Sequence, residues 1–338
     1  MIGGIKMASV YYNGNAVDTT TKDLLTGDLL NKIVKQEIDA KIFDDIFGIF
    51  TNKQLNTGMQ IEEFEVANLQ STDFDPTGAN TLAKANMDFA VLYHKINRRK
   101  TFKATISNAQ VKMAMLSEQN MADVANAITA ELWNSSSIED FDAVKQLFKD
   151  IAGEQKKMVI CDLNGNGNDM DALTKAIQTL ATNMTLPSTL YNFAGFKKEF
   201  NKKEDLVLVI DSATRARLNV DSLAGAFNMD KKELVGNIIV IDSMPAITYT
   251  NEKATKGIEI DIGETNKIIT YKPDSSASTT VSGSAVCILL NKKAIKRDPV
   301  EREIEDQRNG AGRFTNYYLH VTDLLSYSTL RNAVVIVD

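Results

Sequence analysis

The sequence is poor in the residues on which most catalytic and metal sites depend. Its 338 residues include only two histidines, two cysteines and one tryptophan. Cys161 and Cys287 each follow an apolar run, which predicts small buried side chains rather than a disulfide framework. Neither His94 nor His320 has a metal-ligand spacing or a nucleophile motif nearby, so both are interpreted as partly exposed strand residues. We therefore expect no enzyme, no metal and no cofactor.

The chain also lacks the features of a membrane protein and of a protein that grips nucleic acid. No apolar run approaches the length that crosses a bilayer, and the first residues show no secretory signal. The formal net charge is −6, whereas binding to phosphate backbones normally needs a basic excess. A calcium-like stretch runs from Asp162 to Gly167, but its twelfth position is Leu173, where a ligating glutamate belongs. It predicts a solvated turn.

What the sequence does contain begins with an arm and a hairpin. Residues 1–35 are polar and predict an extended arm, and the apolar spacing at 36–50 predicts a short amphipathic helix. Two segments of β character follow at 59–69 and 89–96, on either side of the turn-rich stretch 71–81. They predict a long hairpin that projects from the body. A projecting hairpin has few partners within its own chain, and this implies a neighbouring molecule.

The remainder predicts a mixed α and β body. The longest helical pattern covers 120–152, and the poor helix formers at 134–137 leave a kink or a break open there. A shorter helix is predicted at 170–184, and the Ser/Thr patch at 275–284 is interpreted as a surface loop. The rest of the chain predicts buried strands and short helices, as in a mixed α and β body. The strands are predicted at 206–210, 237–241, 267–271, 285–290 and 333–337, and the helices at 212–218 and 222–227.

Charge is concentrated at the hairpin. Its first strand bears Glu62, Glu63 and Glu65, and the second strand and the stretch after it bear Lys95, Arg98, Arg99, Lys100 and Lys103. The basic stretch lacks the stacking aromatics of a nucleic-acid site, apart from Phe102. It is either a solvated strand and turn or, as we favour, one side of ion pairs formed across the hairpin or with the next subunit. We expect these eight residues, with Phe43 and Phe47 of the amphipathic helix, to make contacts between subunits.

Two long segments resemble the phi-29-like family of phage major head (capsid) proteins. In residues 206–244 an apolar strand ends in Asp211, a turn of the form DxLAxAFNM starts at Asp221, and a second strand ends in Asp242. Residues 316–337, NYYLHVTDLLSYSTLRNAVVIV, are similar to the closing strands of the family. Weaker agreement covers the hairpin and the region 173–187, so the resemblance spans most of the chain from about residue 55.

The resemblance implies an α+β fold of the HK-97-like capsid type with four regions. These are an N-terminal arm (1–55), an extended β-hairpin loop (56–105), a peripheral domain with a long spine helix (106–165 and 312–330), and an axial domain (166–311 and 331–338). The phi-29 protein continues into an immunoglobulin-like domain that has no counterpart here. The N-terminal region is also shorter than a fused scaffolding segment would require, so we expect a separate scaffolding protein.

The implied function is that of a major capsid subunit in the virion, assembled in the cytoplasm of a bacterial host. Copies would form hexamers and pentamers of an icosahedral or prolate head around double-stranded DNA. Expected partners are other copies, a scaffolding protein, a portal or connector protein, and packaged DNA held non-specifically on the inner face, with no membrane. The main alternative is an encapsulin-type bacterial nanocompartment shell protein, which shares the fold. An α/β enzyme and a phage tail or baseplate protein are more distant alternatives.

Overall fold

The computed structural model describes residues 11–12, 15–16, 43–51, 60–74, 76–78, 84, 86–107, 118–167, 169–218, 237–262 and 266–338. The chain divides into two units. The smaller unit comprises Met1–Ile42, Lys103–Ser135 and Glu305–Tyr318, and the larger comprises Phe43–Phe102, Ser136–Ile304 and Leu319–Asp338. Within the described ranges, no helix is both long and apolar enough to cross a membrane.

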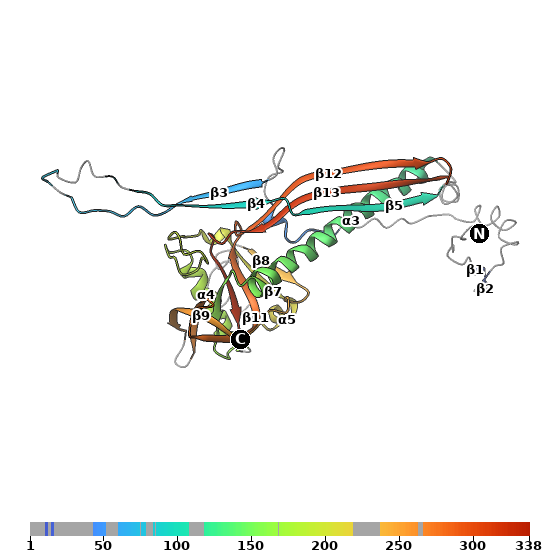
Figure 1. The fold of residues 1–338 in the computed structure, drawn as a ribbon. Helices are drawn as coiled ribbons and strands as arrows, with labels where there is room; N and C mark the ends of the chain where they lie inside the picture. The colour runs from blue at the N-terminus through green and yellow to red at the C-terminus, as the bar shows by residue number, and fades with distance from the viewer. Residues whose placement is uncertain are drawn as a thin grey trace. The chain divides into compact units, whose positions relative to one another are not determined.

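The larger unit is built on a seven-stranded sheet of order β14-β6-β10-β9-β11-β7-β8 (Figure 1). β14 pairs in parallel with β6 on one side and antiparallel with β11 on the other, so the last strand in sequence lies inside the sheet. The first residues of β11 pair with β9, and its later residues lie between β14 and β7. The strands are β6 (Val159–Asp162), β7 (Leu206–Asp211), β8 (Asn237–Ile241), β9 (Thr248–Asp261), β10 (Lys267–Pro273), β11 (Thr280–Asn291) and β14 (Ala333–Val337).

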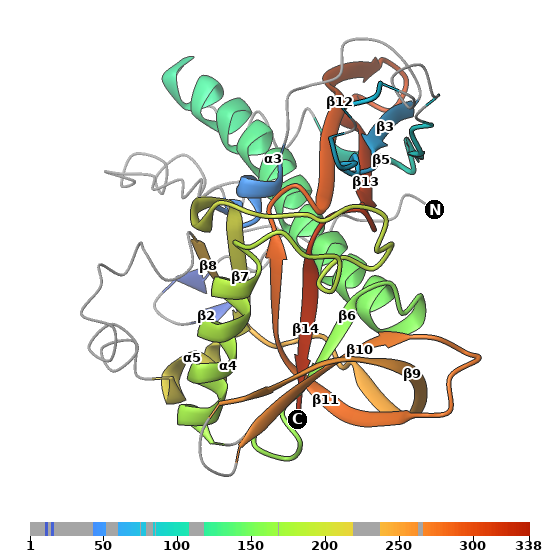
Figure 2. The same ribbon diagram turned by 90° about the vertical axis from the view of Figure 1, so that its left-hand side faces the viewer.

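Each face of this sheet buries its own hydrophobic core, because side chains alternate along a strand. In β14, Ala333, Val335 and Val337 face one core, which also holds Val144 and Phe148 of the long helix α3 (Glu118–Lys149). Val334 and Ile336 face the other core, which is covered by α4 (Met170–Asn183) (Figure 2). All five residues of β14 are buried, so this strand contributes to both cores and exposes no side chain to water.

The hairpin and a second, smaller sheet make up most of the remaining strands. β3 (Gln60–Val66) pairs antiparallel with β4 (Phe89–Lys95), from Gln60 opposite Lys95 to Val66 opposite Phe89. β5 (Arg98–Ser107), β12 (Ile295–Asn309) and β13 (Phe314–Tyr327) form a three-stranded sheet of order β12-β13-β5. The sheet therefore includes residues 295–309, which the resemblance assigned to the axial region.

The smaller unit contains one end of each of these three strands. Thr105 Oγ1 of β5 donates a hydrogen bond of 2.7 Å to Asn316 Oδ1 of β13. Lys103 Nζ lies 5.5 Å from the centroid of the Tyr318 ring, a cation–π contact. Two short strands, β1 (Tyr11–Tyr12) and β2 (Asn15–Ala16), pair with each other.

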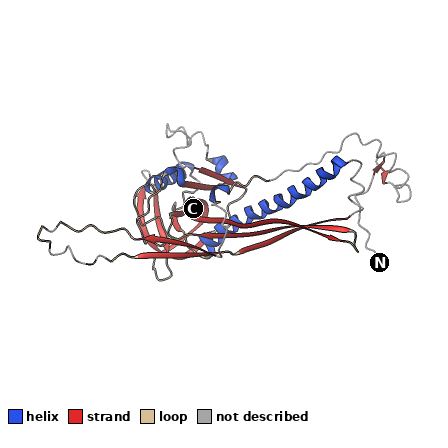
Figure 3. Cartoon of the chain, turned by 90° about the horizontal axis from the view of Figure 1, so that it is seen from above, coloured by secondary structure: helices blue, strands red, loops and turns tan. Residues whose placement is uncertain are grey.

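Most of the elements predicted from the sequence are present, and helices and strands together (Figure 3) confirm the α+β class. The hairpin, α4, α5 (Ser212–Arg217) and all five predicted strands are confirmed. The open question of a break at 134–137 is answered by α3, which runs through this stretch and continues as a π-helical turn, Asp150–Glu154. Ser136 is buried there, and Asn134 Nδ2 binds Glu131 Oε2 one turn earlier.

Two predictions were wrong in the described residues. Residues 43–47 are not helical, and only Gly48–Phe50 forms a single 3-10 turn (η1), because the Asp45 side chain accepts a hydrogen bond from Phe47 N and turns the chain. The patch at 275–284 is a loop only as far as Thr279, since β11 begins at Thr280. The predicted arm at 1–35, the first half of the helix at 36–50, the turn at 221–229 and the helix at 222–227 lie outside the described residues, except for β1 and β2.

The calcium-like stretch is a turn, as predicted. Asp162 Oδ1 accepts a hydrogen bond of 2.7 Å from Asn164 N, and Asn164 and Gly165 both have positive φ, of 55° and 79°. Asparagine and glycine tolerate this backbone better than other residues, which explains their use here. In the part of the chain that the structure describes, no group of three or more His, Cys, Asp or Glu side chains gathers as metal ligands would.

Candidate subunit-contact site at the hairpin

The two faces of the β3–β4 hairpin have the opposite polarity to that of an ordinary surface hairpin. An antiparallel pair normally turns its apolar side to the protein and its polar side to water. Here Glu63 and His94, 7% and 3% exposed, face the body of the same subunit. Phe64, Phe89 and Tyr93, 55%, 59% and 58% exposed, lie on the outer face. The apolar face of the hairpin, which is ordinarily covered, is therefore exposed to solvent.

We call this outer face the aromatic face, and the register explains how it forms. Phe64 lies opposite Val91, and Val66 lies opposite Phe89, so their side chains share one side of the ribbon. The Phe64 and Phe89 rings stack with centroids 5.8 Å apart and an angle of 27° between their planes. The aromatic face comprises Phe64, Val66, Phe89, Val91 and Tyr93. Further along the loop, Leu69, Phe74 and Met87 are also exposed, and large exposed apolar patches mark interaction sites.

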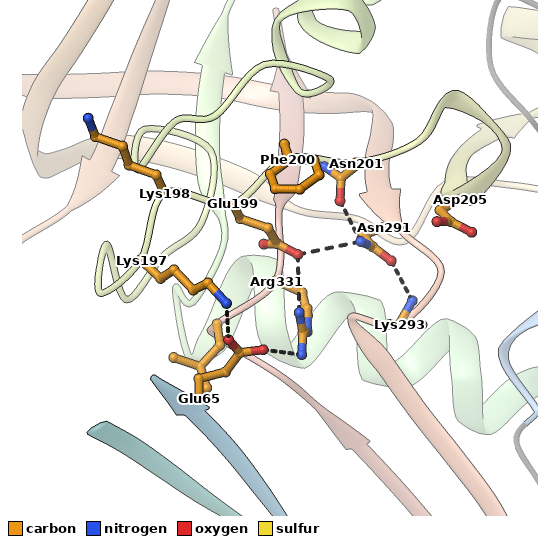
Figure 4. A pocket seen from close by; sticks show the side chains of 11 residues that line it. Glu65, Lys197, Lys198, Glu199, Phe200, Asn201, Asp205, Asn291, Lys293 and Arg331 are labelled. Carbon is orange, nitrogen blue, oxygen red and sulfur yellow. Dashed lines mark hydrogen bonds and ion pairs between the residues drawn. The ribbon is translucent and has the colours of Figure 1, made fainter. Parts of the chain in front are cut away.

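The inner face is held to the body by charged groups, which we call the hairpin anchor; Figure 4 shows Glu65, Lys197, Glu199 and Arg331 of this group. Arg331, at the corner between β13 and β14, donates from Nε to Glu63 Oε1 at 3.0 Å and from Nη2 to Glu65 Oε1 at 2.5 Å. Lys197 Nζ donates to Glu65 Oε2 at 2.9 Å, and Lys296 Nζ lies 3.3 Å from Glu63 Oε1. The hairpin anchor comprises Glu63, Glu65, His94, Lys197, Glu199, Lys296, Ser326 and Arg331.

His94 completes the anchor from the second strand of the hairpin. Its Nε2 lies 3.2 Å from Glu63 Oε2, and its Nδ1 lies 2.6 Å from Ser326 Oγ of β13. One ring therefore joins β4, β3 and the body, with both nitrogens engaged. The interpretation of His94 as a partly exposed residue was wrong, because the buried face of the hairpin is the charged one. His320 is half-buried and contacts Thr101 Oγ1 at 3.0 Å.

Two carboxyl groups of the anchor have strongly shifted pKa values, in opposite directions. Burial alone would raise the pKa of Glu63, but the hydrogen bond with His94 and the positive charges of Lys296 and Arg331 outweigh it and lower the pKa to about 2. Burial raises the pKa of Glu199 to about 7, because Arg331 compensates only in part and Glu65 adds a like charge. Glu199 Oε2 has no hydrogen-bond partner among the described residues.

A second cluster fixes the base of the hairpin to α3, and we call it the Asp140 cluster. Asp140, 1% exposed, accepts from Arg98 Nη1 at 2.6 Å, Arg297 Nη2 at 2.9 Å and Arg302 Nη2 at 3.0 Å. Asp323 of β13 lies 3.7 Å from Arg98 and 3.8 Å from Arg302. A single carboxylate thus ties β5 and β12 to the helix.

The structure separates the charged residues that the sequence predicts as contact candidates. Glu63 and Glu65 lie in the hairpin anchor, and Arg98 lies in the Asp140 cluster. The predicted ion pairs across the hairpin were wrong for these residues, because the register places Leu92 opposite Glu63 and Ala90 opposite Glu65. The side chains that remain exposed are Glu62, Lys95, Arg99, Lys100 and Lys103, of which Lys100 Nζ lies 3.1 Å from Glu139 Oε1.

The two phenylalanine candidates also differ from each other. Phe43 is 37% exposed and packs edge-on against Phe141, with ring centroids 5.6 Å apart. Phe47 is fully buried in its own core, 5.4 Å from the Phe141 ring and 5.9 Å from the Phe148 ring. The turn at Asp45 directs Phe47 inward, so its side chain is not exposed to a neighbour in this structure.

Comparison with known proteins gives consistent results for this chain. It is similar to the major capsid proteins of Bacillus phage GA-1 (27% identical over 332 residues, 96% of this chain and 62% of that protein) and Bacillus phage PZA (25% over 295 residues, 86% and 58%). It spans about three fifths of the length of these relatives. It is also similar to that of Streptococcus phage Cp-1 (23% over 318 residues, 90% and 80%).

Solved structures share the fold at low sequence identity. The capsid structure of Staphylococcus phage Andhra matches with a TM-score of 0.68 at 13% identity, over 90% of this chain and 87% of that one. The capsid structure of cyanophage P-SCSP1u matches with a TM-score of 0.52 at 13% identity, over 97% and 96%. The fold is thus the HK-97-like capsid fold. The sequence model of the family described as Phi29-like phage major capsid protein matches residues 10–337. The chain therefore belongs to this family.

Proposed function

We propose that this chain is the shell-building subunit of a phage head, in which copies form hexamers and pentamers around double-stranded DNA. The observation that carries the proposal is the reversed polarity of the hairpin. The hairpin anchor buries charged groups against the subunit itself, while the aromatic face stays exposed. A subunit with this arrangement gains from a neighbour that covers the aromatic face, because burial of apolar surface is favourable.

The contact we propose is heterologous. The aromatic face of one copy lies on a different surface of the next, and such head-to-tail contacts close into rings. The exposed charges Glu62, Lys95, Arg99, Lys100 and Lys103, with Phe43, would lie at or near these contacts and select the orientation of the neighbour. The role is structural rather than enzymatic, and the family match favours a phage head over the encapsulin alternative.

The division into regions belongs to the same proposal. Residues 1–55 act as an arm and 56–105 as the extended loop, while 106–165 with 312–330 form the peripheral domain and 166–311 with 331–338 the axial domain. We propose that assembly takes place in the bacterial cytoplasm with a scaffolding protein and a portal protein, and that packaged DNA meets the inner face without sequence preference. The net charge of −6 supports a wall that does not bind DNA tightly.

Negative-stain electron microscopy of the purified chain, alone and co-expressed with a scaffolding protein, tests the proposal. We expect capsomers, tubes or shells in at least one of the two preparations. Monomers that persist under both conditions, at concentrations where relatives assemble, would contradict it. A protein that forms closed shells only around a co-purified cargo enzyme would point to a nanocompartment instead.

A further inference from the structure

We propose that the hairpin anchor is a proton-controlled release device, in which protonated Glu199 keeps the hairpin bound to its own subunit and ionised Glu199 frees it. The proposal concerns the single subunit, and it does not depend on the proposed function.

The first argument is that one guanidinium serves three carboxyl groups. Arg331 Nε and Nη2 donate to Glu63 and Glu65 of the hairpin, while its Nη1 lies 3.6 Å from Glu199 Oε1, beyond hydrogen-bond distance. The arginine therefore directs its two short hydrogen bonds to the hairpin and reaches Glu199 through a longer ion pair. A change of charge at Glu199 alters the competition for Arg331 directly.

The second argument is that Glu199 is fixed in place and cannot turn to solvent freely. Its backbone forms a two-way bridge with Ser188, with N–O distances of 3.0 and 2.9 Å. The same short segment also touches the hairpin, because Lys197 Nζ donates to Glu65 and Lys198 N donates to Asn68 Oδ1 at 2.6 Å. The carboxyl of Glu199 is thus held beside the attachment points that its charge affects.

The third argument comes from the groups that face Glu199 from each element packed against it. β3 presents Glu65 and, through Arg331, Glu63; β11 presents Asn291, whose Nδ2 lies 3.5 Å from Oε1; β13 presents the buried phenol of Tyr327. Arg331 is the cation nearest to it among the described residues, and it is shared. Oε2 is buried and has no partner among those residues, and Glu199 is one of the residues that line a hollow of about 220 Å³. A proton on this carboxyl removes a negative charge that the site compensates poorly.

These points give the direction of the switch. Burial and the like charge of Glu65 raise the pKa of Glu199 to about 7 in the docked state, so protonation favours this state. Stabilisation from this group is complete below about pH 4.5 and is lost as the pH rises through about 7. Ionised Glu199 then draws Arg331 away from Glu63 and Glu65, and water enters the hollow. The apolar side chains on this side of the ribbon are Ile61, Ala90 and Leu92, so loss of these pairs removes the charged part of the attachment.

Pulsed electron–electron resonance on the full-length, unassembled subunit tests the device. Spin labels are attached at Ser71→Cys in the hairpin loop and Ser275→Cys in the body, both exposed positions. The native Cys161 and Cys287 are fully buried, so they do not compete for the label. We expect one narrow distance at pH 5.5, and a second, broad population that grows at least tenfold by pH 8.

Two variants decide the matter. Glu199→Gln keeps the shape of the protonated carboxyl and should retain the narrow distance at pH 8, whereas exposed Glu204→Gln should behave as the unaltered protein. Circular dichroism confirms that each variant is folded. A distance distribution that does not change between pH 5.5 and 8, or that broadens equally in Glu199→Gln, would overturn the proposal. Since no assembly is needed, this outcome is independent of whether shells form in the electron microscope.

Discussion

Arg331 and Glu63 are 268 residues apart in the sequence, and Arg331 Nε donates a hydrogen bond of 3.0 Å to Glu63 Oε1. The bond joins the corner before the central strand of the sheet to the first strand of the hairpin. Because the second arm of the same guanidinium binds Glu65, the orientation of the hairpin depends on one planar group with two donor directions. The orientation of the hairpin is therefore set in part by charge and by the geometry of this group.

Replacing this arginine should weaken the subunit markedly. Arg331→Gln leaves Glu63 and Glu65 buried without their shared cation, and breaking a buried pair from one side typically costs about 3–5 kcal/mol. We expect the lower part of this range in denaturant unfolding, because Lys197 and Lys296 remain. Arg99→Gln, at an exposed position, is the matched control and should change the free energy of unfolding by less than about 0.5 kcal/mol. Equal effects of the two changes would contradict the role of the anchor.

The aromatic face should matter for assembly and hardly at all for folding. Phe64→Ser and Phe89→Ser remove side chains that are more than half exposed, so we expect changes in the free energy of unfolding of less than about 1 kcal/mol. Sedimentation velocity and electron microscopy should show the loss of capsomers and shells. Phe47→Ala is the opposite control, because loss of a buried phenylalanine costs about 3–5 kcal/mol. Normal shells from both serine variants would exclude this face as a contact.

Acid should unfold the anchor through Glu63. Its pKa is lowered to about 2 in the folded subunit, from 4.5 for the free side chain. The stabilisation from Glu63 is therefore present above pH 4.5 and is lost as the pH falls from 4.5 towards 2. The difference corresponds to about 3 kcal/mol. Thermal unfolding of Glu63→Gln, followed against pH, should show a weaker dependence in this window than the unaltered protein. An identical dependence in both proteins would show that another group is responsible.

The Asp140 cluster offers a sharper contrast between neighbouring residues. Asp140→Asn leaves Arg98, Arg297 and Arg302 facing one another around a neutral amide, and we expect a loss of at least about 3 kcal/mol. Asp142→Asn, two positions later on the same helix and exposed, should have little effect. Calorimetry gives both values directly. A small effect at Asp140 would mean that the other carboxylates of these arginines, Asp45, Glu139 and Asp323, can compensate for its loss.

Gly283 should tolerate no side chain. A Cβ atom there would lie 2.2 Å from the carbonyl oxygen of Asp338 and 3.2 Å from Val337 Cβ. The first of these contacts is with backbone, and it falls beside a register shift between β11 and β9. We expect Gly283→Ala to lower the melting temperature by several degrees, as about 2 kcal/mol of strain would. Gly310→Ala, with no atom within 4 Å of the added Cβ, is the control.

The sequence predicted those parts of the fold where local pattern and burial agree. The strands ending at Asp211 and at Val337 are unbroken apolar runs, and they proved to be buried strands. β12 was missed because Glu301 to Gln307 is almost wholly polar and shows no period-2 apolar pattern. Its pairing with β13 determines its conformation, and a single-sequence pattern does not contain that information.

The candidate site was predicted in location but not in polarity. The alternation of Phe89, Val91 and Tyr93 indicated a strand with one apolar face, and the usual rule would turn that face inward. What reverses it is a set of cations from distant parts of the chain, above all Lys197 and Arg331. No residue adjacent to Glu63 or Glu65 in the sequence indicates these partners. The anchor could therefore be identified only from the structure.

Because β14 lies inside the sheet, the fold cannot be completed until the whole chain has been translated. A ribosome completes the hairpin long before it reaches Arg331, and synthesis runs from the N-terminus. A chain that stops short of this point carries the aromatic face but lacks Arg331 of the hairpin anchor and the strand between β6 and β11. Such a product cannot complete its sheet, and it lacks the arginine that fixes the orientation of its hairpin. In the shell that we propose, we expect prematurely terminated copies to be left out for this reason.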